Sequence, residues 1–179
     1  MPTHAPLILT DASIKLSKTA DTTGLVELAC DASHVEISPD TSVTTVDTFC
    51  GSTDYPGITK WSLILTLIQS FDTDATEEVL SAAVALGVPV PFQIAGYKTP
   101  PVSATNPAWT GKVMPAPYSP INGDAGEVST IELEWAITEG PTKITTPPAG
   151  QAASQASAPA SRTESRSRLE PELCRRTRP

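Results

Sequence analysis

The sequence has 179 residues, 39 % of them hydrophobic, which is enough for one folded domain and leaves little room for a second. Up to residue 145 the chain holds six lysines, no arginine and 17 acidic residues, a net charge of −11, whereas the rest holds six arginines and three glutamates. An acidic body without arginine lacks the forked donors that read guanine edges and clamp phosphates, so specific nucleic-acid binding is disfavoured.

Targeting and membrane signals are missing from the sequence pattern. The opening MPTHAPLILT has no basic start followed by a long apolar run. No window reaches the roughly 18 consecutive apolar residues that a membrane span needs. We therefore expect a cytoplasm-like compartment and no membrane partner.

Alternation of apolar and polar residues with period two dominates the chain and predicts strands with one buried face. The clearest strand segments are 61–71 and 129–138. The first has apolar residues on both faces, so we expect a central strand covered on both sides. The second places Ile131, Leu133 and Trp135 on one face and Glu132 and Glu134 on the other. Further strands are predicted at residues 13–17, 25–30, 34–37, 43–49, 90–95 and 111–114.

Residues 75–86 break this pattern, because their apolar side chains recur at helical spacing. Asp74 is the expected N-cap, with Glu77 as its capping-box partner, and Gly87 is the expected end. The sequence therefore predicts a mainly β fold, an antiparallel β-sandwich or barrel with one short flanking helix.

Three stretches rich in proline, glycine and short polar residues are predicted to be exposed loops: 50–59, 99–106 and 115–126. The last is long for a connection within a compact domain, and loops of that length are usually functional or mobile. Residues 146–179 are rich in Ala, Pro, Ser and Arg. They hold too little apolar surface to offset chain entropy, so the prediction is a folded domain at 1–145 and a disordered tail at 146–179.

Catalytic and metal-binding patterns are not evident. There is no Gly-x-Ser-x-Gly and no phosphate-binding glycine loop. The histidines His4 and His34 match no metal-ligand spacing. Cys30, Cys50 and Cys174 are too few and too far apart for a disulfide framework, and buried, reduced thiols are expected for the first two. We expect no enzyme activity, no cofactor and no metal.

Glu132 and Glu134 are the one carboxylate pair with a spacing, about 7 Å, that some glycosidases use. Nothing around them predicts the dry pocket that would raise a pKa, so a solvated acidic face is the preferred interpretation. Trp61 and Trp135 are in phase with aliphatic neighbours and are expected in the core. Trp109 lies outside any strand pattern and is expected to pack on a loop or on a neighbouring subunit.

The order of the motifs resembles that of the major tail (tail tube) protein of long-tailed bacteriophages infecting actinobacteria. The residues that carry the resemblance are TFCGSTDYPGITKWSLILTLIQSF, then a short helix and VPFQIAGY, then NPAWTGKVMPAPYSPINGDAGEVSTIELEWAITEGPTKI. The resemblance covers about residues 7–144. It implies hexameric rings that stack into a tube through which DNA leaves the capsid, in the virion tail after assembly in the host cytoplasm. The implied partners are further copies of the chain and other tail proteins, such as the tape measure and the tail tip.

The acidic body agrees with this resemblance, because a negatively charged lumen would let DNA slide without binding. Glu127, Glu132 and Glu134 are the candidates for the lumen lining. Loops that are long for a monomer are expected to contact other subunits, and the candidates there are Asp54, Tyr55, Pro56, Trp109, Tyr118 and Ile121.

Three other functions stay open at the level of the sequence. The first is an immunoglobulin-like surface or capsid-decoration binding module, which can remain monomeric. The second is a head–tail connector or tail terminator, which would form a single ring. The third is an enzyme that uses Glu132 and Glu134.

Overall fold

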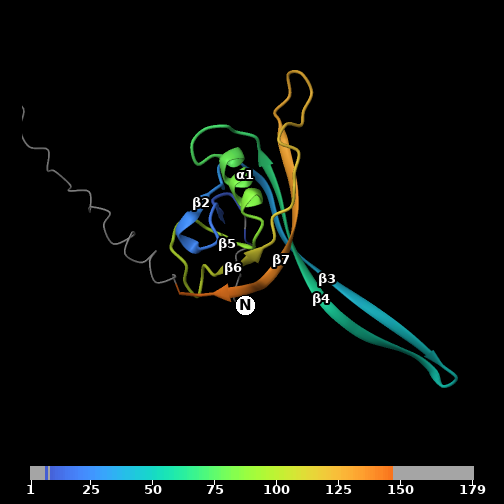
Figure 1. The fold of residues 1–179 in the computed structure, drawn as a ribbon. Helices are drawn as coiled ribbons and strands as arrows, with labels where there is room; N and C mark the ends of the chain where they lie inside the picture. Colours follow the sequence, from blue (N-terminus) through green and yellow to red (C-terminus); the bar gives the residue numbers. More distant parts are fainter. Residues whose placement is uncertain (1–6, 8, 147–179) are drawn as a thin grey trace, which may run out of the picture. The chain divides into compact units, whose positions relative to one another are not determined.

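The structure, a computed structural model, describes residue 7 and residues 9–146 (Figure 1). Apart from its first residue, the segment predicted to be disordered lies outside the described residues. The elements in chain order are β1 (Ser13–Ser17), the 3-10 helix η1 (Thr22–Gly24), β2 (Leu25–Glu27), β3 (Ala32–Thr48), β4 (Gly51–Ile68), α1 (Thr76–Leu86), β5 (Val90–Ala95), β6 (Ala108–Val113) and β7 (Thr130–Ile144).

The strands of this described part form one antiparallel sheet in the order β2-β1-β5-β6-β7-β4-β3. The mainly β, antiparallel fold with one helix is therefore confirmed. The predicted strands at 34–37 and 43–49 fall on the single long strand β3, except for Phe49, which lies in the turn after it. Strand β3 is an edge of the sheet and pairs only with β4.

The core lies between one face of the sheet and α1 (Figure 1). Leu63, Leu65 and Leu67 of β4 stand opposite Trp135, Leu133 and Ile131 of β7, and all six are buried. The alternation in β7 is therefore confirmed, since Glu132 and Glu134 are exposed. Helix α1 buries Val79, Leu80 and Ala83 in the same cluster.

The expectation that segment 61–71 is covered on both faces is wrong. Strand β4 ends at Ile68, and Phe71 is 70 % exposed in the turn that follows. Ile64, on the face away from the core, is half-buried and lies between Glu134 of β7 and Glu36 of β3. Within the described residues, acidic neighbours and solvent surround this outer face in place of a second apolar layer.

The predicted cap of the helix is also corrected. Ala75 takes the N-cap position without a side-chain hydrogen bond, and Asp74 adopts a left-handed backbone with φ 59°. Glu78, one residue later than predicted, reaches back so that its Oε2 accepts from the Asp74 N–H at 2.9 Å. Gly87 ends the helix in the left-handed conformation, as predicted.

The predicted loop at 50–59 is the first half of β4, which pairs with β3 in a long hairpin. Strand β7 begins to flank β4 only at Trp61, so the outer part of the hairpin is a two-stranded ribbon. Opposite this stretch the strand register shifts between Thr41 and Val43, which pairs with Pro56. Prolines are accepted at open edges and beside such bulges, so the ribbon tolerates Pro56. The glycine and proline residues thus mark an irregular ribbon, and the loop prediction for this stretch is wrong.

The expectation of buried thiols is wrong for both described cysteines, which are exposed. Cys30 precedes β3 and Cys50 follows it, so each lies in a turn at one end of that strand. Turn residues remain near solvent because their backbone groups are not paired in the sheet. The third cysteine, Cys174, lies outside the described residues.

Candidate self-assembly surfaces

The hairpin of β3 and β4 projects from the body of the fold (Figure 1). Hydroxyl and carboxylate groups connect its two strands outside the body. Thr41 and Thr59 are joined by a hydrogen bond of 2.9 Å between their Oγ1 atoms, and Thr45 Oγ1 donates to Asp54 Oδ1 at 2.7 Å. At the tip, Thr48 Oγ1 donates to the Gly51 carbonyl oxygen at 2.9 Å. These contacts fix the register of the ribbon up to its turn.

Large apolar side chains on this ribbon face water. Tyr55 is 57 % exposed, Ile58 is 81 % exposed and Phe49 at the tip is fully exposed, with Val43 and Val46 also exposed. A two-stranded hairpin by itself is only marginally stable in water, and contiguous exposed apolar residues mark interaction surfaces. The hairpin therefore has the properties of a segment that is stabilised by a partner.

Asp54, Tyr55 and Pro56, three of the predicted contact residues, lie together on this hairpin and are exposed. Tyr55 is opposite Thr44, on the other face of the ribbon from the Thr45–Asp54 pair. Phe49 is not among the predicted contact residues, because the sequence pattern placed it in the strand predicted at 43–49. The signal was an aromatic residue directly before a Cys-Gly turn, with no apolar partner at strand spacing after it.

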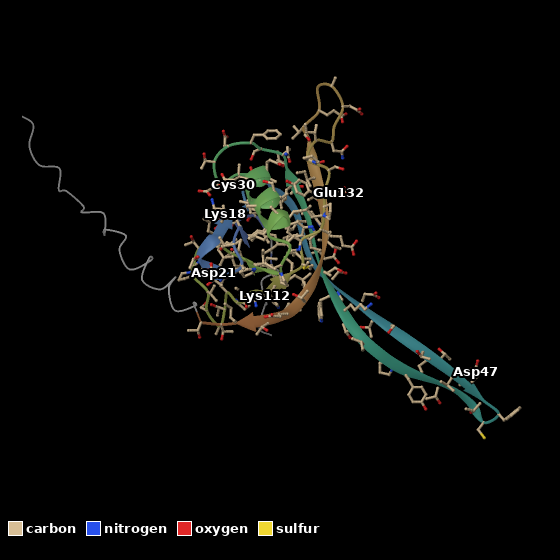
Figure 2. All side chains as sticks on the ribbon, viewed as in Figure 1. Lys18, Asp21, Cys30, Asp47, Lys112 and Glu132 are labelled. Carbon is tan, nitrogen blue, oxygen red and sulfur yellow. The ribbon has the colours of Figure 1, made fainter. Side chains whose placement is uncertain are left out.

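The outer face of the sheet carries two of the predicted acidic residues, Glu134 and Glu132, the second of which is labelled in Figure 2. Two rows of paired residues cross β7, β4 and β3 on this face. The first row is Glu134, Ile64 and Glu36, and the second is Glu132, Thr66 and His34. Glu127 is exposed in the loop before β7 and belongs to neither row. The structure therefore adds Glu36 to the acidic face, which the sequence pattern does not identify because the predicted strand at 34–37 is short and weak.

The connection between β6 and β7 contains the predicted loop 115–126, which has no regular secondary structure. Tyr118 Oη donates to Glu77 Oε2 of α1 at 2.9 Å, and Gln69 Nε2 donates to the same oxygen at 3.1 Å. Burial, and then the hydrogen bond to Glu77, raise the pKa of Tyr118 well above its usual value. Tyr118 therefore anchors the loop on the helix, whereas Ile121 is exposed.

Trp109 lies in β6, where it is opposite Ile94 and Lys143, so its placement outside any strand is corrected. It is half-buried and borders a cleft beside the connection from β5 to β6. The predicted loop 99–106 in that connection is confirmed. Its buried Asn106 donates through Nδ2 to the carbonyl oxygens of Tyr97 at 2.9 Å and Pro100 at 2.6 Å.

The predicted contact residues do not form one site. Strand β4 runs from the hairpin turn to Ile68, which is opposite Thr130 at the start of β7. The loop with Tyr118 and Ile121 therefore enters the β4–β7 pair at the end remote from the hairpin tip (Figure 1). This arrangement provides two separate surfaces at opposite ends of one pair of strands.

The described residues contain no group of three or more His, Cys, Asp or Glu side chains placed to hold a metal ion. Over the same part of the chain, no helix has the length and apolar character needed to cross a membrane. Glu132 and Glu134 face solvent, and neither borders the clefts that are lined by Cys30, by Trp109 and by Tyr118.

No protein-family model matches the chain, and a search of curated proteins finds no match. Solved structures match its fold. One is the tail of an empty gene transfer agent particle with C6 symmetry, with a TM-score of 0.52 and 17 % identity, covering 76 % of this chain and 96 % of that one. The virion of a native gene transfer agent matches with a TM-score of 0.50 and 18 % identity, over 76 % and 96 %. The chain has the fold of a particle-tail component.

An extracellular contractile injection system, in its sheath-tube complex in the extended state, matches with a TM-score of 0.50 and 13 % identity, over 78 % of this chain and 90 % of that one. These three structures are all assembled particles or complexes. The tail-protein resemblance is thus confirmed at the level of the fold, and it extends to particles other than phages. An actinobacterial host stays a prediction.

Proposed function

We propose that this chain is a structural tail-tube protein that assembles with copies of itself into hexameric rings, which stack into a conduit for DNA. The observation that carries the proposal is the fold shared, over nearly the whole length of the matching chain, with a tail of C6 symmetry. The exposed apolar hairpin supports it independently, because such a surface needs a partner. The proposed location is the virion tail, after assembly in the host cytoplasm with tape-measure and tail-tip proteins.

The acidic outer face suits the lining of such a conduit. Six copies of a body with a net charge of −11 would create a strongly negative potential wherever Glu132, Glu134 and Glu127 line the lumen. Phosphates would be repelled from this wall, so DNA would pass without specific binding. Glu36 lies in the same row as Glu134 and contributes to the same potential.

Electron microscopy of the purified protein across a concentration series tests the assembly. Long hollow tubes or stacked rings are expected. A single ring that does not stack would support a connector or tail terminator instead. A monomer at every concentration, also in the presence of tail-tip proteins as initiators, would favour the binding-module alternative and contradict the proposal.

The lumen assignment has its own test. Tubes of the variant Glu127→Lys, Glu132→Lys, Glu134→Lys should retain their shape and slow or block DNA ejection from particles. The control variant places three lysines at exposed positions outside that face, at Asp72 and Thr73 before α1 and at Ser81 on α1. Ejection at the normal rate through intact triple-variant tubes would refute the lining.

A further inference from the structure

One cleft of the body opens beside the core, next to the row of the outer face that contains His34. It lies at the base of β3, has a volume of about 440 Å³ and is bordered by Cys30, His34 and Lys98. Its volume is in the range of pockets that receive ligands and side chains. Its apolar lining consists of Leu9, Ala12, Ile14, Ala29, Ala32 and Val35.

The tip of the hairpin provides a matching side chain. Phe49 is fully exposed, and it is followed by the exposed Cys50. Aromatic side chains that fill a pocket supply much of the binding energy at protein interfaces. A fully exposed phenylalanine at the end of a projecting ribbon is therefore suited to insert into an apolar cleft.

The charges of the two surfaces are compatible. Asp47 and Asp54 are exposed on the hairpin near its tip. Most of the body would repel them, since its net charge is −11. The cleft contains one cation, Lys98, together with one carboxylate, Asp11, and Lys98 forms no ion pair with another described residue. The cleft is thus a neutral site with a lysine available to the acidic tip.

The geometry of β3 decides which copy of the chain can supply the tip. Cys30 and Cys50 flank the two ends of this 17-residue strand, which spans about 50 Å at the usual rise per residue. Figure 2 shows Cys30 on the body and Asp47 at the far end of the hairpin. A hairpin therefore cannot insert its tip into the cleft of its own chain, and the tip in a cleft must come from a second copy.

We propose that Phe49 of one copy inserts into the cleft beside Cys30 of a second copy, in a repeating head-to-tail contact. Because the tip and the cleft are different surfaces of the same chain, the contact is heterologous and can generate rings or filaments. The proposal rests on the proposed function, and it identifies the surface that receives the hairpin. In the docked pair, Cys50 lies within reach of the second copy's Cys30.

Crosslinking of the native thiols tests this contact. In a Cys174→Ser background, Cys30 and Cys50 are the two remaining cysteines. A short bismaleimide adds one thiol to each of its two double bonds, so no oxidant is needed. We expect a ladder of covalent multimers on denaturing gels, with a Cys30–Cys50 crosslinked peptide in mass spectrometry. The variants Cys30→Ser and Cys50→Ser should each abolish that peptide.

The outcomes separate this inference from the proposed function. Tubes that yield no Cys30–Cys50 peptide, or only Cys50–Cys50 links, overturn the docking and leave the tube function standing. Cys30–Cys50 multimers without tubes support the docking and contradict the tube. The absence of both tubes and crosslinks overturns both.

A substitution at the tip provides a second measurement with a matched control. Phe49→Ser should lower the crosslinking rate about tenfold or more, as expected when an aromatic anchor is lost from an interface. Phe71→Ser removes an exposed phenylalanine from the turn after β4 and should leave the rate unchanged. Equal rates for Phe49→Ser and the unsubstituted protein would overturn the insertion of this side chain.

Discussion

Replacement of Tyr55 by threonine tests the hairpin as the surface that drives assembly. Tyr55 is 57 % exposed, and a tyrosine side chain buries roughly 150–250 Å² when it is fully covered. A partner that covers the exposed part would remove about 100 Å² from water, worth about 2.5 kcal/mol. Each contact should therefore weaken by about 50-fold. Threonine is β-branched and favours strands, so the pairing of residue 55 with Thr44 should persist.

The assay is the critical concentration for assembly, measured by sedimentation and checked by electron microscopy. We expect it to rise by about one to two orders of magnitude, with an unchanged thermal unfolding midpoint because Tyr55 lies outside the core. Phe71→Thr is the control, since Phe71 is exposed to a similar extent outside the hairpin. A critical concentration within twofold of the original value, with the fold intact, would refute the assignment of the hairpin.

Three further predictions concern contacts within the fold. Asn106→Ala should lower the free energy of unfolding by about 2–3 kcal/mol in urea denaturation, because the buried Asn106 side chain makes three hydrogen bonds to the backbone of Tyr97 and Pro100. A loss below about 0.5 kcal/mol would contradict this. Tyr118→Phe should cost about 1 kcal/mol at pH 7 through the lost hydrogen bond to Glu77. Since the pKa of Tyr118 is raised, that difference should be present below about pH 10 and be lost as the pH rises further; a pH-independent difference would argue against it. The hydrogen bond from the Asp74 N–H, and then Lys18, lower the pKa of Glu78. Glu78→Gln should therefore lower the melting temperature at neutral pH, and this difference should vanish as the pH falls through the lowered pKa. A difference that persists in acid would oppose this account.

The strand content was accessible from the sequence because burial of one face imposes a period of two. Strands β1 and β5 have the predicted bounds, and the alternation of β7 correctly separated Leu133 and Trp135 from Glu132 and Glu134. The end of α1 was predictable as well, since Gly87 is the residue that accepts a left-handed backbone at low cost. These features depend on neighbours a few residues apart in the chain.

The hairpin depended on contacts that a local pattern does not encode. Residues 50–59 carry turn signals, yet they form a strand because β3 pairs with them along the ribbon. The helix cap likewise depended on tertiary contacts: Tyr118 and Gln69 both bind Glu77, and the neighbouring Glu78 reaches back to Asp74.

The sequence alone indicated a mainly β, acidic fold with one α-helix in the part of the chain that the structure describes, because composition and periodicity report burial directly. The tertiary structure decided which residues meet a partner. It placed Phe49 and Cys50 at one end of β3 and Cys30 with its cleft at the other, and it put the loop of Ile121 at the opposite end of the β4–β7 pair from the hairpin tip. Which side chains remain exposed after folding depends on strand order and register across the whole sheet, and no short segment of sequence contains that information.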